Sequence, residues 1–279
     1  MIQLSQMVEK SRDLAALPAS VTRLAAVIAN PFSVIDEVVE AIRFDQALTA
    51  SVLREANSAS SGSRRVISTV KDAAIRIGGA RILSHCIAGA LKTTLAEALP
   101  SYGYKEQDLW RHSVATAVAA EELGLLVKTS GCGLEFTAAL LHDIGKLVMG
   151  RIAPTAAMRS VWENVIINNL TCEQAEFSVF GFSHAILGAE IVKAWELPNS
   201  IENAVRNHHT FTPSSDLCTD VVIISNLVAH AMGEGLGHEG MSLSIDEAIS
   251  QRLNIHREDF ERICARAAGS FSRTLALYT

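Results

Sequence analysis

The sequence predicts an all-α protein with two helical lobes. The chain is 49% hydrophobic but only 5% aromatic, so Ala, Leu, Ile and Val must build the core, which suits close-packed helices better than a β-sandwich. Apolar residues recur at spacings of three and four almost throughout, and no segment shows the alternation of a strand. A length of 279 residues allows one large domain or two small ones. We expect an N-terminal lobe over residues 1–103 and a C-terminal lobe over residues 104–279 that fold as one unit.

The N-terminal lobe is expected to hold five helices. Ser33 is the predicted N-cap of the second helix, and Gly78-Gly79 separates the last two. Pro100-Ser101-Tyr102-Gly103 is the clearest break in the first half and marks the lobe boundary. The apolar patterns that predict these helices cover residues 21–28, 34–42, 48–56, 66–77 and 82–99.

The C-terminal lobe is expected to be helical throughout. Pro154 begins or interrupts one segment, Thr171-Cys172-Glu173-Gln174 has the form of a capping box, and so does Ser244-Ile245-Asp246-Glu247. Glycines between Gly233 and Gly240 indicate a flexible turn. The predicted helices cover residues 109–126, 136–149, 162–170, 183–195, 200–209, 220–232 and 258–277.

Charge and composition exclude several classes of function. A formal net charge of −6 argues against a nucleic-acid partner, because a phosphate backbone needs an excess of Lys and Arg. Arg64-Arg65 is interpreted as part of a solvated loop.

No apolar run approaches the ~20 residues that span a bilayer, and no signal peptide is visible, so we expect a cytoplasmic protein without a membrane partner. The five cysteines are widely spread without a CxxC pair, which favours reduced, mostly buried thiols.

The residues that carry chemistry centre on Leu140-Leu141-His142-Asp143. An adjacent imidazole and carboxylate can supply one nitrogen and one oxygen ligand to a divalent ion. A single histidine on an apolar helix is more often structural. The His142-Asp143 pair therefore indicates a metal site only together with further candidate ligands elsewhere in the chain. The predicted metal ligands are His112, His142, Asp143, His184, His208 and His209. The remaining histidines are interpreted as structural or exposed, namely His85, His230, His238 and His256.

Asp143 and Lys146 are the candidate catalytic residues. The two oxygens of Asp143 could bridge two cations roughly 3.5–4 Å apart, which would clamp a phosphate ester and activate water. Lys146 lies three residues on, near the same helix face, and could neutralise phosphate charge; alternatively it only favours a helix C-terminus. Adjacent helical residues point about 100° apart, so His208 and His209 could serve two ions, or one could bind metal while the other meets phosphate.

These residues resemble the HD superfamily of metal-dependent phosphohydrolases, and more closely its HDOD branch, a regulatory domain of bacterial signalling proteins. The spacing of His112, His142-Asp143, His184 and His208-His209 carries the first resemblance. The second is carried by segments along nearly the whole chain: Leu17-Pro18, Asp45-Gln46-Ala47-Leu48, Leu53-Arg54-Glu55-Ala56-Asn57-Ser58-Ala59, Ala73-Ala74-Ile75-Arg76-Ile77-Gly78, Phe180-Gly181-Phe182-Ser183-His184-Ala185-Ile186-Leu187-Gly188-Ala189 and Trp195-Glu196-Leu197-Pro198. The resemblance implies a two-lobed helical HDOD bundle.

Two departures from the resemblance bear on activity. Asn226 stands where HD hydrolases usually place a final acidic ligand, and a neutral amide oxygen binds a hard cation less well. Asp220 lies one and a half turns earlier and is expected to face elsewhere. The branch that hydrolyses cyclic di-GMP carries Gly-Tyr-Pro after its paired histidines, whereas Thr210-Phe211-Thr212-Pro213 follows here, so that substrate is not expected.

Three functions remain open from the sequence. The resemblance implies a signalling module that acts through contacts with other signalling proteins and hydrolyses little or nothing. The retained ligands favour instead a phosphohydrolase acting on a nucleotide or other phosphate ester, which makes a phosphate-containing small molecule the alternative partner. A third hypothesis is a di-metal site that senses redox state, oxygen or metal availability without turnover. The ligand types suit one or two ions of iron, manganese or zinc, and spacing does not choose among them.

Overall fold

The computed structural model describes residues 2–30, 32–58, 66–127, 133–210, 212, 215–239 and 247–278. Within these ranges the regular structure is helical, and the only β pairing is one isolated bridge between Leu99 and Tyr104. The all-α prediction is therefore confirmed. Arg64-Arg65 and residues 244–246 of the second predicted capping box lie outside the described residues.

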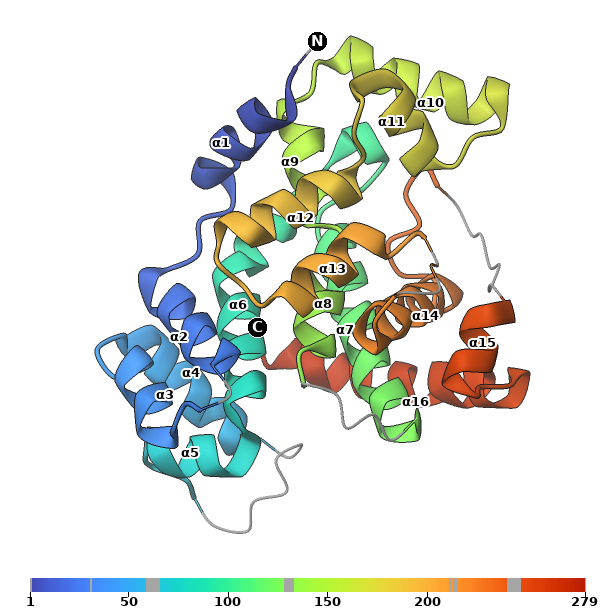
Figure 1. The fold of residues 1–279 in the computed structure, drawn as a ribbon. Coiled ribbons are helices and arrows are strands. Elements are labelled where there is room, and N and C mark those ends of the chain that lie inside the picture. Colours follow the sequence, from blue (N-terminus) through green and yellow to red (C-terminus); the bar gives the residue numbers. More distant parts are fainter. Residues whose placement is uncertain are drawn as a thin grey trace.

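Six helices and one short 3-10 helix form the first third of the chain (Figure 1). α6 ends four residues earlier than its apolar pattern predicts, because the Leu99 backbone pairs with that of Tyr104 (Leu99 N to Tyr104 O, 2.9 Å). The elements are α1 (Leu4–Leu14), α2 (Ala19–Ala29), α3 (Ile35–Ile42), α4 (Gln46–Ala56), α5 (Val70–Ile77), α6 (Gly79–Leu95) and η2 (Pro100–Tyr102).

The prediction that Ser33 caps a helix is wrong. Val34 is the N-cap of α3, and its backbone N–H donates to the Glu37 carboxylate at 2.9 Å. The carboxylate of Glu37, three residues beyond this N-cap, thus satisfies the amide of Val34 itself. The helix begins one residue later as a result.

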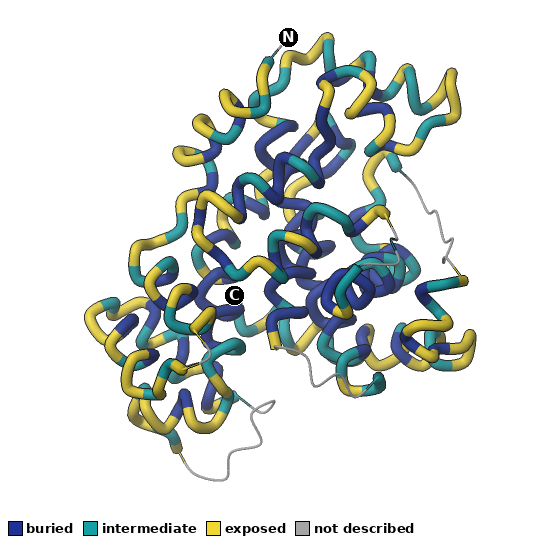
Figure 2. Tube along the Cα trace, viewed as in Figure 1, coloured by how far each residue is buried: buried dark blue, intermediate teal, exposed yellow. Residues whose placement is uncertain are grey.

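Ten helices follow, and those at the centre of the molecule are the most buried (Figure 2). The Thr171 capping box is confirmed, since the Thr171 hydroxyl accepts from Gln174 N and the Gln174 side chain accepts from Thr171 N. Pro154 is the N-cap of its helix rather than an interruption. The helices are α7 (Asp108–Val127), α8 (Glu135–Leu141), α9 (Ile144–Ile152), α10 (Thr155–Asn168), α11 (Cys172–Phe180), α12 (His184–Ala194), α13 (Asn199–Asn207), α14 (Leu217–Ala231), α15 (Glu247–Leu253) and α16 (Arg257–Ala276).

One predicted helix is divided in two. Residues 136–149 were expected to form a single helix, but α8 ends at Leu141 and α9 begins at Ile144. The apolar pattern runs through the break because both helices are buried on most sides, so periodicity alone does not reveal it. The break falls at His142-Asp143 and positions the site described below.

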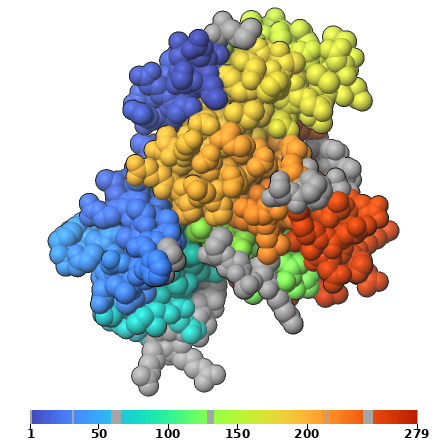
Figure 3. Space-filling view, in the orientation of Figure 1, coloured from blue at the N-terminus to red at the C-terminus, as the bar shows by residue number. Residues whose placement is uncertain are grey.

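The chain crosses the expected lobe boundary at both of its ends. α1 packs on α9 and α12 rather than on the N-terminal helices α2–α6 (Figure 3, dark blue beside yellow). α16 packs on α7, and Tyr278 just beyond it places its hydroxyl 3.1 Å from His85 Nδ1 on α6. The boundary at residue 103 stays a prediction, and the shared packing supports the prediction of a single folding unit.

Dividing the chain at residue 105 is therefore expected to give insoluble or molten fragments. Each half would expose apolar helix faces that the other half covers. Near-UV circular dichroism, dye binding and cooperative urea unfolding of the two separately expressed fragments measure this. Two soluble fragments that each unfold cooperatively would contradict the prediction.

Among the described helices, no single one is both long enough and apolar enough to span a membrane. The pair α11–α12, which bends by 77° at its break, meets both conditions only when the two helices are joined.

Candidate metal centre

The break between α8 and α9 sets His142 and Asp143 at the centre of the bundle. His142 is the C-cap of α8, and Asp143 is the N-cap of α9 with φ −100° and ψ 12°. Gly145 follows in the first turn of α9, where an added Cβ would overlap His184 O and lie 2.9 Å from Gly188 N. The absence of a side chain at Gly145 thus lets α9 approach the start of α12, which carries His184.

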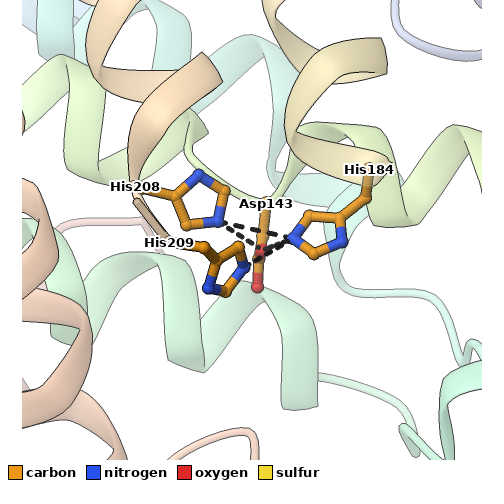
Figure 4. A group of neighbouring side chains, drawn as sticks. All are labelled: Asp143, His184, His208 and His209. Atoms are coloured by element: carbon orange, nitrogen blue, oxygen red, sulfur yellow. Dashed lines mark hydrogen bonds and ion pairs between the residues drawn. The ribbon is translucent and has the colours of Figure 1, made fainter. Parts of the chain in front are cut away.

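Asp143 lies between two groups of histidines. Its Oδ1 is 3.4 Å from His184 Nε2 and 3.5 Å from His208 Nε2. Its Oδ2 is 3.5 Å from His142 Nε2 and 3.6 Å from His112 Nε2. Figure 4 shows His184, His208 and His209 converging on Asp143 from α12 and from the end of α13. The structure therefore brings all six predicted ligands together, with one carboxylate oxygen facing each group.

His208 and His209 both join the Oδ1 group. α13 ends at Asn207, so these two residues lie in the turn beyond it. His184 Nε2 is 3.4 Å from His208 Nε2 and 2.9 Å from His209 Nε2. His209 is exposed whereas the others are buried, so the centre meets solvent at His209.

Fixed acceptors determine which nitrogen of the buried histidines carries the proton. In each case Nδ1 lies within hydrogen-bond distance of an oxygen that can only accept, so Nδ1 is the donor and Nε2 presents a lone pair to the centre. The pairs are His112 with Glu234 O (3.0 Å), His142 with Ala139 O (2.7 Å), His184 with Glu176 Oε2 (2.7 Å) and His208 with Val205 O (2.7 Å).

These lone pairs face one another, which a cation between them would explain. His112 Nε2 and His142 Nε2 are 3.2 Å apart, and two acceptors at that distance cannot hydrogen-bond. Two ligand atoms about 2.0–2.1 Å from one ion lie about 2.9–3.4 Å apart at right or tetrahedral angles, which matches the nitrogen separations here. Asp143 Oδ1 is buried and accepts no hydrogen bond from the described residues. Geometry and donor types thus fit iron, manganese or zinc.

Lys146 occupies the interior beside the centre. Its Nζ lies 2.9 Å from Asp143 Oδ2 and 2.7 Å from Glu239 Oε1, and the side chain is buried. Burial alone would raise the pKa of Asp143, but Lys146 and the histidines outweigh burial and hold that pKa well below its usual value. The helix C-terminus interpretation of Lys146 is wrong, because Lys146 lies in the first turn of α9.

Burial keeps the inner histidines neutral. It lowers the pKa of His112 to about 4, despite the opposing charge of Asp143, and it lowers the pKa of His142 well below 6.5. A histidine must be neutral to bind metal. These two side chains are therefore available as ligands at neutral pH.

Glu176 is a residue that the sequence reasoning missed. It is fully buried on α11, where its Oε2 accepts from both the backbone N–H and Nδ1 of His184, and its Oε1 accepts from Tyr102 OH at 2.6 Å. Burial opposes protonation of His184, but Glu176 outweighs it and raises the pKa of His184. Such a carboxylate orients a ligating imidazole and increases its basicity. Its only sequence signal is an acid inside an apolar helix.

The segment after α14 was missed as well. The Glu234 carbonyl holds His112, and the Glu239 carboxylate holds Lys146. Gly235 has φ +66°, and an added Cβ would overlap the His112 side chain, so only glycine suits this position. His230, predicted to be structural or exposed, is buried with its ring centroid 5.0 Å from that of His112, and its Nδ1 has no hydrogen-bond partner among the described residues.

Asn226 and Asp220, both on α14, lie near the place in the sequence where HD hydrolases usually have their final acidic ligand. Asp220 faces away from the centre, as expected, and pairs with Arg252 of α15 (Oδ1 to Nη2, 2.5 Å). Asn226 is buried one turn before His230 on α14, and its Oδ1 accepts no hydrogen bond from the described residues. An unpaired buried amide oxygen costs free energy, so Asn226 presents an acceptor that a ligand or water would satisfy.

An acid sensitivity of the metal-free protein follows from the lowered histidine pKa values. In the unfolded chain His112 takes up a proton near pH 6.5, whereas in the folded chain it does so only near pH 4. Acid therefore favours unfolding between these values, by about 3 kcal/mol for His112 alone. His142 acts in the same direction, while the raised pKa of His184 offsets part of the loss. Urea unfolding of the metal-free protein at pH 8, 6.5 and 5 measures this, and a stability that does not fall toward pH 5 would contradict it.

The helical fold is that of a known family. The model of the HDOD domain matches residues 14–211. The chain belongs to the HDOD family.

Three solved structures share the fold. A candidate signal transduction protein from Marinobacter aquaeolei superposes with a TM-score of 0.73 at 20% identity, over 100% of this chain and 61% of that one. An HDOD domain protein of unknown function from Geobacter sulfurreducens gives 0.62 at 22% identity, over 99% and 96% of the two chains. A candidate phosphohydrolase from Shewanella amazonensis gives 0.61 at 20% identity, over 94% and 97%.

Among curated sequences, an uncharacterized protein of Treponema pallidum is 25% identical over 202 residues. The match covers 71% of this chain but only 38% of that protein. The chain therefore spans little more than a third of the Treponema protein and somewhat under two thirds of the Marinobacter protein.

Proposed function

We propose that this HDOD protein is a signalling module that holds one or two divalent transition-metal ions and acts through contacts with other signalling proteins, with little or no hydrolysis. The observation that carries the metal assignment is the set of facing Nε2 lone pairs around the unpaired Asp143 Oδ1. HDOD membership supports the signalling role.

Each group of side chains would hold one ion. His184, His208 and His209 form one set of ligands with Asp143 Oδ1, and His112 and His142 form the other with Asp143 Oδ2. A bound ion would supply Lewis acidity and lower the pKa of a coordinated water. The protein contributes the orientation of the imidazoles, through Glu176 and the backbone carbonyls, and the exclusion of water from all but the His209 side.

Two features argue for weak hydrolysis. Lys146 is already paired with two carboxylates, Asp143 and Glu239, so its charge is not free to neutralise a phosphate. Asn226 leaves the ligand set one negative charge short of that expected for a hydrolase. Losses in the ligand shell commonly lower metal affinity on the order of tenfold to a hundredfold, so the second ion should be held more weakly.

The alternative is a phosphohydrolase acting on a nucleotide or other phosphate ester. One observation favours it: the two oxygens of Asp143 face separate histidine groups, as in centres where one carboxylate bridges two ions. A redox-, oxygen- or metal-sensing centre without turnover would use the same ligands.

Elemental analysis tests the metal assignment. Protein purified without added metal is expected to contain between one and two equivalents of iron, manganese or zinc, or to take them up on titration. X-ray absorption should then report nitrogen and oxygen ligands. Protein that holds no metal and binds none on titration would refute the proposal.

Hydrolysis is expected to be absent or very low in the wild type and to depend on residue 226. Wild type, Asn226→Asp and the surface control Asn203→Asp are each loaded with iron, manganese or zinc and assayed against cyclic di-GMP and common nucleotides. Asn226→Asp is expected to bind the second ion on the order of tenfold to a hundredfold more tightly. Hydrolysis by Asn226→Asp alone would support a centre that retains its metal ligands but does not hydrolyse phosphate esters because residue 226 is not acidic. Robust turnover by the wild type would favour the enzyme instead.

A further inference from the structure

A cavity of about 270 Å³ lies apart from the metal centre, where helices of both predicted lobes meet. Its walls come from α4, α6, α7, α8 and the end of α16, and none of the six predicted metal ligands lines it. Leu125, Phe136 and Leu277 contribute apolar surface, and Glu55, Arg81 and Tyr278 contribute polar groups. Concave sites with apolar walls and few polar groups are typical of small-molecule binding.

Glu55 is the unusual member of this wall. It is only 2% exposed, and its Oε1 accepts from Arg81 Nε at 2.9 Å. Its Oε2 is buried and accepts no hydrogen bond from the described residues. Leaving a buried carboxylate oxygen unpaired is costly, because water that would solvate it has been removed. Glu55 also belongs to the Leu53–Ala59 segment that carries the HDOD resemblance, which the metal centre does not use.

Arg81 and His85, which also line the cavity, already have partners. Arg81 is paired with Glu121 as well as with Glu55. His85 has Ser51 Oγ 2.8 Å from its Nε2 and Tyr278 OH 3.1 Å from its Nδ1, and burial lowers its pKa, so it is neutral.

The charge of the wall is therefore negative. Glu55, Glu121 and Glu135 carry three negative charges against the single positive charge of Arg81. An anionic ligand would meet carboxylates and an arginine that is already neutralised. A cationic ligand would meet the carboxylate of Glu55, one oxygen of which has no hydrogen-bond partner among the described residues.

We propose that this cavity binds a small organic cation, an amidinium, guanidinium or primary amine on a compact apolar body, whose N–H groups donate to Glu55 while Leu125 and Phe136 cover the body. The volume of about 270 Å³ is just below the range of known sites, about 300–1,000 Å³, and therefore suits a small ligand. An ionised hydrogen bond to a buried carboxylate contributes both affinity and selectivity for the cation. This proposal does not depend on the metal centre.

Benzamidine is the probe for this site, with neutral benzamide and anionic benzoate as probes of the same shape. The full-length protein is titrated with each, and binding is followed by ligand-observed NMR and by the shift in unfolding temperature. Benzamidine is expected to bind saturably. Benzamide and benzoate are expected to bind with an affinity lower on the order of tenfold to a hundredfold, because each lacks the charged hydrogen bond to Glu55.

Two variants locate the binding. Glu55→Gln can still accept from Arg81 but loses the charge, and it is expected to weaken benzamidine binding on the order of tenfold or more. Leu125→Trp places a larger ring at the wall, where Leu125 is 64% exposed, and should abolish binding without disturbing the fold. Glu122→Gln changes a neighbouring carboxylate of α7 that pairs with Arg266 and does not line the cavity, and it should bind as the wild type does.

Metal content and unfolding temperature are measured for every variant and are expected to stay at the wild-type values. Wild-type protein that binds benzamidine but neither holds nor takes up metal would count against the metal proposal alone. The cavity proposal is overturned by unchanged benzamidine affinity in both Glu55→Gln and Leu125→Trp, by equal binding of benzoate, or by no saturable binding at millimolar benzamidine.

Discussion

Replacing Asp143 by Ala is expected to remove nearly all bound metal. The substitution deletes the one negatively charged ligand and the oxygen atoms that face both histidine groups. Loss of a residue that merely supports a ligand costs about tenfold to a hundredfold in affinity, so loss of this shared ligand should cost more. Metal content after dialysis against a buffered free-metal concentration measures the effect.

The Asp143→Ala protein should still fold, which makes the result interpretable. Lys146 keeps Glu239 as its partner, 2.7 Å away, so no uncompensated buried charge remains. Asp220→Asn is the matched control, because Asp220 is also a buried acid of the C-terminal lobe but pairs with Arg252 outside the centre. The control should retain metal. Wild-type metal content in Asp143→Ala would show that the ion, if bound, is held elsewhere.

Gly145→Ala is expected to be severely destabilising. The added Cβ would overlap His184 O and lie 2.9 Å from Gly188 N, and both are backbone atoms that cannot turn aside. α9 and α12 must then separate, which moves Asp143 away from His184. Overpacking typically costs about 1–3 kcal/mol and occasionally more, and a backbone clash places this variant at or above the upper end. Urea unfolding of metal-free protein measures the loss, and metal titration should show weaker binding.

Gly89→Ala is the control for this substitution. Gly89 lies inside α6, and an added Cβ there would meet nothing within 4 Å. The same change should therefore be neutral or stabilising by about 0.4–1 kcal/mol. Equal stability of Gly145→Ala and Gly89→Ala would contradict the close approach of α9 and α12.

Most helices could be predicted because their signals are local. The apolar spacing of residues 220–232 and of residues 109–126 predicts α14 and α7 to within a few residues. The division at His142-Asp143 could not be predicted in this way. Every residue from Leu140 to Met149 is buried, so the apolar pattern continues across a break that the packing against α12 makes necessary.

The sequence by itself determined the helical class and the candidate ligands, since helix periodicity and the chemistry of imidazole and carboxylate depend on residue type and near neighbours. Only the tertiary structure decided how those ligands are arranged and which groups orient them. Glu176 reaches His184 from another helix, and the Glu234 carbonyl holds His112 from 122 residues away in sequence. Contacts of this kind follow from how helices pack, and packing depends on shape and burial over the whole chain. For the same reason, the sequence does not reveal the unpaired oxygen of Glu55, which depends on the packing of α4, α6, α7, α8 and the end of α16.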